Sequence, residues 1–373
     1  MSKLTANINP EMLSWAREEM GLTPENLCKK IDIPIHQYHK WEDSGNSMPF
    51  GVLKEISRIL KRQTAVFFLP ETPPRTKMPH DYRNIKYRSG ELSIEVRKAI
   101  RNADKYRSTA SELRDKDYWK RVYWWESELM KFTDLTLTNS DIIRWTREFI
   151  DISLSQQLKF NSNSDAYRTW RSMIEDKFGV LVFQFSMPLN EVQGFCFSDY
   201  YPYAIVVNSK HSYTGRIFTL FHELGHIFKK QSGLCLPDFV DEQNQELEFE
   251  CNRFSGNFLV PNEMLATVDS IEDLEINSRI LKVSKEVYLR RLFHAEMIAP
   301  NRFFELLTEV QASYSKIPEK KELRIPITVR RKAERGSTFY NMVLEAVNKR
   351  SLPYSSASDL LGLNISKLMR ELR

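Results

Sequence analysis

The sequence Phe218-Thr-Leu-Phe-His222-Glu223-Leu-Gly-His226-Ile-Phe228 contains two histidines four residues apart, with a glutamate directly after the first. Residues four apart in an α-helix lie on the same face, one turn above each other. Two imidazoles placed in this way can bind one Zn²⁺ ion, and the glutamate can take a proton from a water molecule beside it. Because most other side chains here are apolar, the segment predicts a buried helix with a metal site, rather than two core histidines and a surface glutamate.

A catalytic zinc site of this kind needs a third protein ligand and leaves its fourth position open. The nearest downstream source is an acidic run without Lys or Arg, which contains Asp238, Asp241, Glu242, Glu246, Glu248 and Glu250. Phe254 and Phe258 follow at helical spacing and predict a second helix. That helix can offer Glu248 or Glu250 to the metal, and the spacing does not choose between them. We expect the first three carboxylates of the run to face solvent.

Three motifs of the sequence resemble the ImmA/IrrE family of zinc metallopeptidases: His222-Glu-Leu-Gly-His226, Glu248-x-x-Cys-Asn252-x-Phe254 and Leu259-Val-Pro261. The similarity extends over residues 140–265. The sequence departs from the family pattern at Cys251 and Ser255, where alanine is usual. Both residues are small enough for close helix packing, although a thiol this near the metal would perturb its surroundings.

The resemblance implies roles for individual residues. His222, His226 and Glu248 would bind zinc, and Glu223 would be the general base. It also implies a regulatory activity, in which a repressor, an antitoxin or a toxin partner is cleaved at a limited number of positions. The resemblance implies that this cleavage would belong to a phage, mobile-element, stress or toxin–antitoxin circuit.

Composition restricts the compartment and the number of domains. A chain of 373 residues is expected to form two or three domains. Its four cysteines lack CxxC spacing, which favours reduced thiols in a cytoplasmic protein. No N-terminal apolar segment resembles a signal peptide and no run has the length of a membrane span, so we expect no membrane contact. The net charge is only +5.

Residues 1–70 are predicted to form five short helices, of which the second and third are joined by a tight turn, as in a helix-turn-helix. Their order, with Trp41-Glu42, resembles the Xre/Cro type of repressor. In that geometry the third helix would present three side chains to the major groove: His36, Gln37 and Lys40. The segment nevertheless carries nine basic and eight acidic residues. Because strong DNA binders are more basic, a protein-docking or structural module is the alternative.

The predicted fold class is α+β and predominantly helical. We expect a helix-turn-helix module at residues 1–70, a linker and helical region at 71–139, a zincin-like core with a small sheet at 140–265, and a basic helical region at 266–373. Short runs at 180–185, 194–197 and 204–207 are the expected strands, and an edge strand near 194–207 could pair with an extended peptide. Asp141 and Asp165 are the expected caps of the first two core helices.

These observations predict a regulatory intracellular zinc-dependent endopeptidase that cleaves a repressor or partner protein and carries an attached DNA-binding module. The alternatives are a DNA-binding transcriptional regulator or an antitoxin-like binding protein, either with a purely structural zinc site. The chain could also form oligomers. The residue that stabilises the reaction's oxyanion is left open among Tyr200, Tyr201, Tyr203, His211, Tyr213 and His294.

Overall fold

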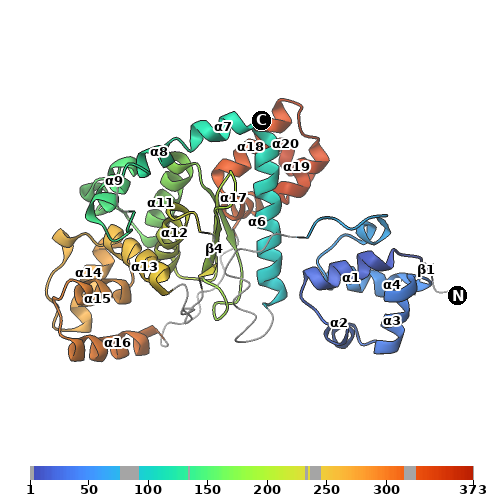
Figure 1. Cartoon of the computed structure of the whole chain (residues 1–373), viewed down its shortest axis with the longest axis horizontal. Coiled ribbons are helices and arrows are strands. Elements are labelled where there is room, and N and C mark those ends of the chain that lie inside the picture. Colours follow the sequence, from blue (N-terminus) through green and yellow to red (C-terminus); the bar gives the residue numbers. More distant parts are fainter. Residues whose placement is uncertain are drawn as a thin grey trace. The chain divides into compact units, whose positions relative to one another are not determined.

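The computed structural model describes residues 4–75, 92–132, 135–231, 234–235, 245–314 and 325–372 (Figure 1). The chain divides into two compact units, one of Met1–Met78 with Ile85–Asp104 and one of Pro79–Asn84 with Lys105–Arg373. The division falls within helix α6 (Ile94–Leu113). Residues 76–91 and 133–134 of the predicted linker and helical region, and residues 315–324 of the predicted basic C-terminal region, lie outside the described residues.

The first unit is made of short helices around one apolar core. Its elements are β1 (Thr5–Ala6), α1 (Pro10–Glu19), α2 (Pro24–Ile31), α3 (Ile35–Ser44), β2 (Met48–Pro49), α4 (Phe50–Ile59), η1 (Thr64–Phe68) and the start of α6. Thr23 caps α2 by accepting a hydrogen bond from the backbone of Asn26. Gly45 ends α3 with φ 68°, and a Cβ there would lie 2.0 Å from the carbonyl oxygen of Ile8, so glycine is needed.

The second unit contains a four-stranded sheet in the order β3-β5-β4-β6. Its strands are β3 (Leu181–Phe185), β4 (Gly194–Phe197), β5 (Ala204–Asn208) and β6 (Leu234–Cys235). β3 runs parallel to β5, whereas β4 is antiparallel to both β5 and β6. The first three strands are almost entirely buried, which explains why they are continuous apolar runs in the sequence.

Helices cover both faces of this sheet (Figure 1). On one face Phe183 of β3 contacts the rings of Tyr106 in α6 and Phe339 in α18. On the other face Gln184 accepts a hydrogen bond from Arg216 of α12. The helices of this unit, besides the end of α6, are α7 (Lys116–Val122), α8 (Trp125–Leu129), α9 (Ser140–Ile150), α10 (Leu154–Gln157), α11 (Asn163–Phe178), α12 (Tyr213–Phe228), α13 (Gln245–Leu259), η2 (Asn262–Met264), α14 (Ile271–Leu281), α15 (Lys285–His294), α16 (Pro300–Tyr314), α17 (Ile327–Arg335), α18 (Ser337–Asn348), α19 (Tyr354–Leu361) and α20 (Ile365–Glu371).

The predicted α+β, predominantly helical fold class is confirmed. Two predicted caps are wrong: Asn139, rather than Asp141, caps α9, and Ser162, rather than Asp165, caps α11. Each helix is preceded by several polar residues that can accept the same backbone hydrogen bond, so composition alone does not select one of them. The predicted domain boundaries at residues 70, 139 and 265 stay predictions.

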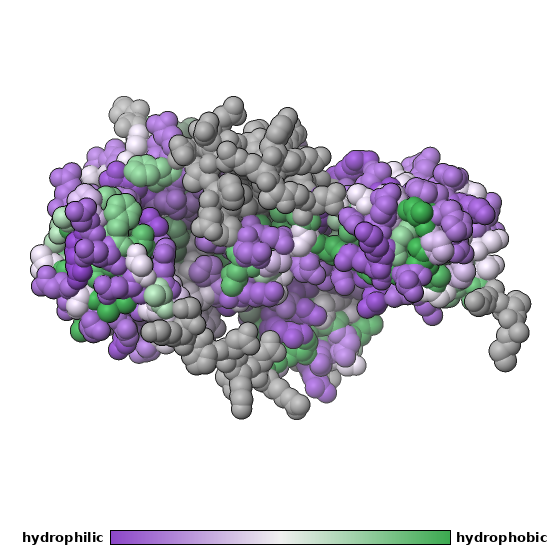
Figure 2. Space-filling view, turned by 90° about the horizontal axis from the view of Figure 1, so that it is seen from below, coloured by the Kyte–Doolittle hydropathy of each residue, from purple (hydrophilic) through white to green (hydrophobic). Residues whose placement is uncertain are grey.

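The face of the molecule seen in Figure 2 is largely polar where it is coloured. Figure 2 shows hydrophilic side chains over most of the visible face, with hydrophobic ones in smaller patches. Scattered apolar side chains are normal on folded proteins. Among the described helices, none combines the length and the apolar composition needed to cross a lipid bilayer.

Candidate metal centre

Helix α12 places the two histidines of the HExxH motif in the interior of the second unit. Ser212 begins the helix by accepting a hydrogen bond from the backbone nitrogen of Gly215 at 3.1 Å. From Thr219 to Phe228 every residue is buried. Such burial explains the apolar composition around the motif, and helical geometry directs His222 and His226 to the same side.

Helix α13 packs against α12 and brings a carboxylate to the two imidazoles. Glu248 Oε2 lies 3.2 Å from His222 Nε2, and Glu248 Oε1 lies 3.1 Å from His226 Nε2. The two Nε2 atoms are themselves 3.1 Å apart. Three donor groups from two helices therefore converge on one point.

The spacing and chemistry of these donors fit a zinc ion. Ligands about 2.0–2.1 Å from zinc at the corners of a tetrahedron lie about 3.3 Å from one another. The distances between His222, His226 and Glu248 are close to this value. Two imidazole nitrogens and one carboxylate are also a donor set that zinc accepts in catalytic sites.

Asn252 supports the first of these histidines. Its Oδ1 lies 3.0 Å from His222 Nδ1, the ring nitrogen that points away from the donor cluster. A partner at this position orients the imidazole and leaves Nε2 available to a metal. Glu248 and Asn252 are four residues apart, so one face of α13 supplies both groups.

Glu223 is fully buried beside the donor cluster. Neither of its carboxylate oxygens accepts a hydrogen bond from a nitrogen or hydroxyl of a described residue, and the thiol of Cys196 is a polar group next to it. Burial raises the pKa of Glu223 to about 7, although the nearby histidines partly oppose this effect. A bound divalent cation would lower this pKa, because it favours the carboxylate form.

The pKa values of the candidate metal ligands depend on one another. Burial raises the pKa of Glu248, but hydrogen bonds from His222 and His226 outweigh it and hold this pKa well below its usual value. Burial lowers the pKa of His226, but Cys251 and then Glu248 outweigh it, so this pKa is raised. The Cys251 thiol, expected to perturb the site, is thus buried close enough to affect a histidine of the motif.

Glu250, the alternative third ligand, faces another part of the structure. Its carboxylate forms an ion pair of 2.8 Å with Lys229 and accepts a hydrogen bond from the backbone nitrogen of Leu137 at 3.3 Å. The structure therefore places Glu248, and not Glu250, with the two histidines. The three carboxylates predicted to face solvent, Asp238, Asp241 and Glu242, lie outside the described residues.

The candidate oxyanion donors occupy different surroundings. Tyr201 and Tyr203 each donate a hydrogen bond of 2.6 Å to Glu126, and Tyr200 packs on Arg107. His294 lies beside Phe249, the residue after Glu248. The hydroxyls of Tyr201 and Tyr203 are therefore engaged, the hydroxyl of Tyr200 shares a hydrogen bond of 3.3 Å with Ser108, and the oxyanion donor stays open.

The strand beside this site does not have a free edge along its whole length. β4 pairs with β5 on one side, while Gly194 and Phe195 pair with β6 on the other. At those two residues β6 occupies the position that an extended peptide would need. Pairing of an extended peptide with a strand near residues 194–207 therefore stays a prediction. In that prediction the peptide cannot pair with Gly194 and Phe195 while β6 occupies their second side.

Gly194 is a residue whose importance the sequence did not reveal. A Cβ at this position would lie 2.4 Å from Thr219 Cγ2, 2.8 Å from the carbonyl oxygen of Val206 and 3.5 Å from Glu223 Oε1. The absence of a side chain thus lets β4 approach α12 next to Glu223. The sequence signal for this contact was a glycine in a predicted strand, because glycine in a strand often marks a place where another part of the chain approaches the backbone closely.

We expect Gly194→Ala to lower the free energy of unfolding by about 1–3 kcal/mol, because the added methyl group meets a backbone oxygen that cannot move alone. Denaturant unfolding of the full chain measures this change. Gly51→Ala in α4 is the matched control, since a Cβ there has nothing within 4 Å. The control is expected to be neutral or to stabilise by up to about 1 kcal/mol. Equal effects of the two substitutions would contradict the proposed close approach.

The residues predicted to contact DNA lie on α3 of the first unit. His36 and Lys40 are exposed, and Gln37 is partly exposed. Tyr38 and Trp41 anchor the helix in the core of this unit, and Gln37 borders this buried side because Trp41 follows it by one turn. The three side chains are therefore accessible, whereas their role in base or phosphate contact stays a prediction.

One part of the chain matches a known protein family. Residues 175–293 match the family model of Peptidase_M78, described as an IrrE N-terminal-like domain. The matched range contains all four predicted residues of the metal centre, and this match supports a metallopeptidase of the ImmA/IrrE kind. The family is metal-dependent. Residues 1–70 lie outside the match, so their resemblance to Xre/Cro repressors stays a prediction. No match was found among curated proteins or among solved structures.

Proposed function

We propose that this protein is a regulatory zinc-dependent endopeptidase that cleaves a repressor or another partner protein. The observation that carries the proposal is the convergence of His222, His226 and Glu248 next to the buried carboxylate of Glu223. The family match to residues 175–293 supports the same class of activity.

The proposed roles follow from the chemistry of these groups. His222, His226 and Glu248 would hold the ion, and Asn252 would fix the orientation of the first imidazole. Zinc, when bound, supplies Lewis-acid chemistry at the scissile carbonyl. Glu223 accepts a proton from the attacking water at a carboxylate oxygen and delivers it to the leaving amine.

A purely structural zinc site explains these features less well. Structural zinc sites have four protein ligands, whereas three candidate ligands converge here among the described residues. A buried carboxylate without a strong hydrogen-bond donor also costs stability. Function compensates for such a cost in a catalytic base, but a structural site has no use for it.

Proteomics of cells that express the wild-type chain or Glu223→Gln tests the proposed function. We expect one or a few proteins to be cleaved only in the presence of the wild-type chain. Identical sets of protein termini in the two cultures, at equal levels of the two chains, would contradict an endopeptidase. The proposal places this activity in the cytoplasm, consistent with the buried thiols of Cys28 and Cys251.

We further propose that α3 contacts DNA, because His36, Gln37 and Lys40 are accessible on one helix of a compact helical unit. Gln37→Ala is expected to relax base preference, since a glutamine amide can recognise adenine. Lys40→Ala is expected to weaken binding to all sequences and to reduce the salt slope by about 1. Binding of the full-length chain to a randomised DNA library at two salt concentrations measures both effects. Complete lack of salt-sensitive binding would favour the protein-docking alternative.

A further inference from the structure

A polar cavity lies on the side of α13 that carries Arg253 and Asn257. Its volume is about 440 Å³, and its lining residues are Arg253, Asn257, Asn262, Leu265, Arg291, His294, Ala295 and Met297. Phe249, Arg253 and Asn257 are spaced four residues apart along α13, which places them on one face of the helix. The candidate metal ligands are not among the lining residues, so this cavity is separate from the metal centre.

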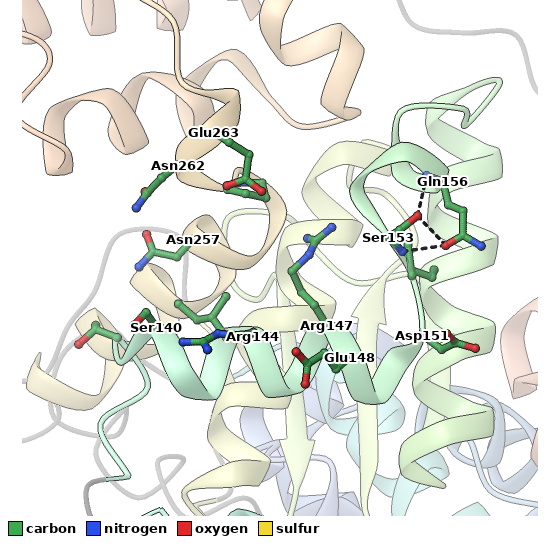
Figure 3. Close-up of a pocket in the computed structure, with 14 residues that line it drawn as sticks. Ser140, Arg144, Arg147, Glu148, Asp151, Ser153, Gln156, Asn257, Asn262 and Glu263 are labelled. Atoms are coloured by element: carbon green, nitrogen blue, oxygen red, sulfur yellow. Dashed lines mark hydrogen bonds between the residues drawn. The ribbon is translucent and has the colours of Figure 1, made fainter.

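The charge of this cavity differs from that of its larger neighbour. Figure 3 shows the neighbouring cavity, of about 760 Å³, where basic side chains such as Arg147 stand among acidic ones such as Glu148 and Glu263. The two cavities share Asn257 and Asn262. The smaller cavity is lined by two arginines and a histidine, and no acidic residue is among those described as lining it.

Arg291 of α15 is held rigidly in the wall of this cavity. It is 5% exposed, its Nε donates a hydrogen bond of 3.1 Å to the carbonyl oxygen of Val260, and its Nη2 donates one of 2.6 Å to Asn262 Oδ1. A guanidinium has five N–H donors, so these two bonds leave others available. Because the planar group is fixed in advance, a ligand would not have to order it.

Arg253 brings a second positive charge to the same place. Its Nε is buried and has no hydrogen-bond partner among the described residues, and its guanidinium lies 5.3 Å from the ring of Phe249. The Oδ1 atom of Asn257 is also buried without a partner there. The electropositive character of the cavity is evident at His294: burial lowers its pKa, and the charges of Arg253 and Arg291 lower it further.

Two guanidinium groups that have no acidic partner among the described residues repel each other, and a bound anion removes this repulsion. We propose that the cavity formed by Arg253, Arg291 and His294 binds a phosphoryl group. A tetrahedral oxyanion has enough acceptor oxygens for two guanidinium forks, and these charge-assisted hydrogen bonds are stronger than neutral ones. The cavity is larger than one phosphate ion needs, so a phosphate ester is the expected form. Neither Glu223 nor any of the three candidate metal ligands lines this site.

Thermal unfolding and calorimetric titration of the full-length chain test this site with two probes, inorganic phosphate and phosphoserine. At ten times its Kd, a ligand that binds only the folded state is expected to raise the unfolding midpoint by about 3–5 °C. Serine is expected to have no effect. Tighter binding of phosphoserine assigns an ester, and tighter binding of inorganic phosphate assigns the free anion; both support the site.

Variants distinguish this site from the metal centre and from the general surface. Arg253→Gln is expected to weaken phosphate binding about tenfold or more, and Arg253→Lys to weaken it less. His294→Gln provides a second test if Arg253→Gln does not fold. The matched control is Arg279→Gln, which alters an exposed arginine of α14 and is expected to bind like wild type.

Three results would overturn the proposal. The first is absence of binding by both probes at millimolar concentration. The second is unchanged binding in Arg253→Gln and His294→Gln. The third is a loss of binding in His222→Ala together with retention in Arg253→Gln, since that would assign the anion to the metal centre.

Discussion

Replacing Glu223 by glutamine is expected to reduce hydrolysis of the partner protein by about 10²–10⁴-fold, the range that a general base contributes. The substitution keeps the size of the side chain and removes the group that accepts the proton. The side chain is fully buried next to the donor cluster, and the carboxylate of Glu248 in that cluster is assigned to the metal, so we expect no other group to take over this role. The measurement is the rate of cleavage of the partner found by proteomics, with bound zinc measured on the same samples.

Two further variants are needed to interpret this result. Glu223→Gln is expected to retain zinc and fold, whereas His222→Ala is expected to lose both zinc and activity. Glu246→Gln is the matched control, since it makes the same change at an exposed position of α13. If Glu223→Gln matches wild type in cells while His222→Ala does not, the metal is structural and the protein acts by binding.

The second large effect is expected in metal content. Purified wild-type chain is expected to hold about one zinc ion, because one set of three donors with an open position forms one site. His222→Ala and Glu248→Gln are each expected to lose most of it. Asn252→Ala is expected to weaken binding by about 10–100-fold, as is typical when the partner of a metal-bound histidine is removed. Competition with a chelator of known affinity measures these differences.

Glu250→Gln is the control for the third ligand. Its carboxylate pairs with Lys229 rather than with the histidines, so zinc affinity is expected to stay near that of wild type. Loss of this ion pair, which is partly exposed, is expected to cost no more than about 1 kcal/mol of stability. If Glu250→Gln loses more zinc than Glu248→Gln, the assignment of the third ligand to Glu248 is wrong.

Much of the fold was accessible from the sequence because its signals are local. The strands at 181–185, 194–197 and 204–208 agree with the predicted runs, since strands buried on both faces are continuously apolar. Ser284 caps α15 by accepting a hydrogen bond from the backbone nitrogen of Val287. The caps of α9 and α11 were misassigned where two or more polar residues compete for one position. The composition of residues 1–70 likewise indicated a helical module, but not whether it contacts DNA.

Local sequence is sufficient to establish a buried helix with His222 and His226 on one face, because helical periodicity depends only on backbone geometry. The position of the third carboxylate required tertiary packing. Glu248 and Glu250 are two residues apart, about 200° around one helix, and the rotation of α13 against α12 places one at the histidines and the other at Lys229. The cavity of Arg253 and His294 also required tertiary packing. Arg253 lies on α13 and His294 on α15, and no local sequence pattern predicts that these two helices pack together.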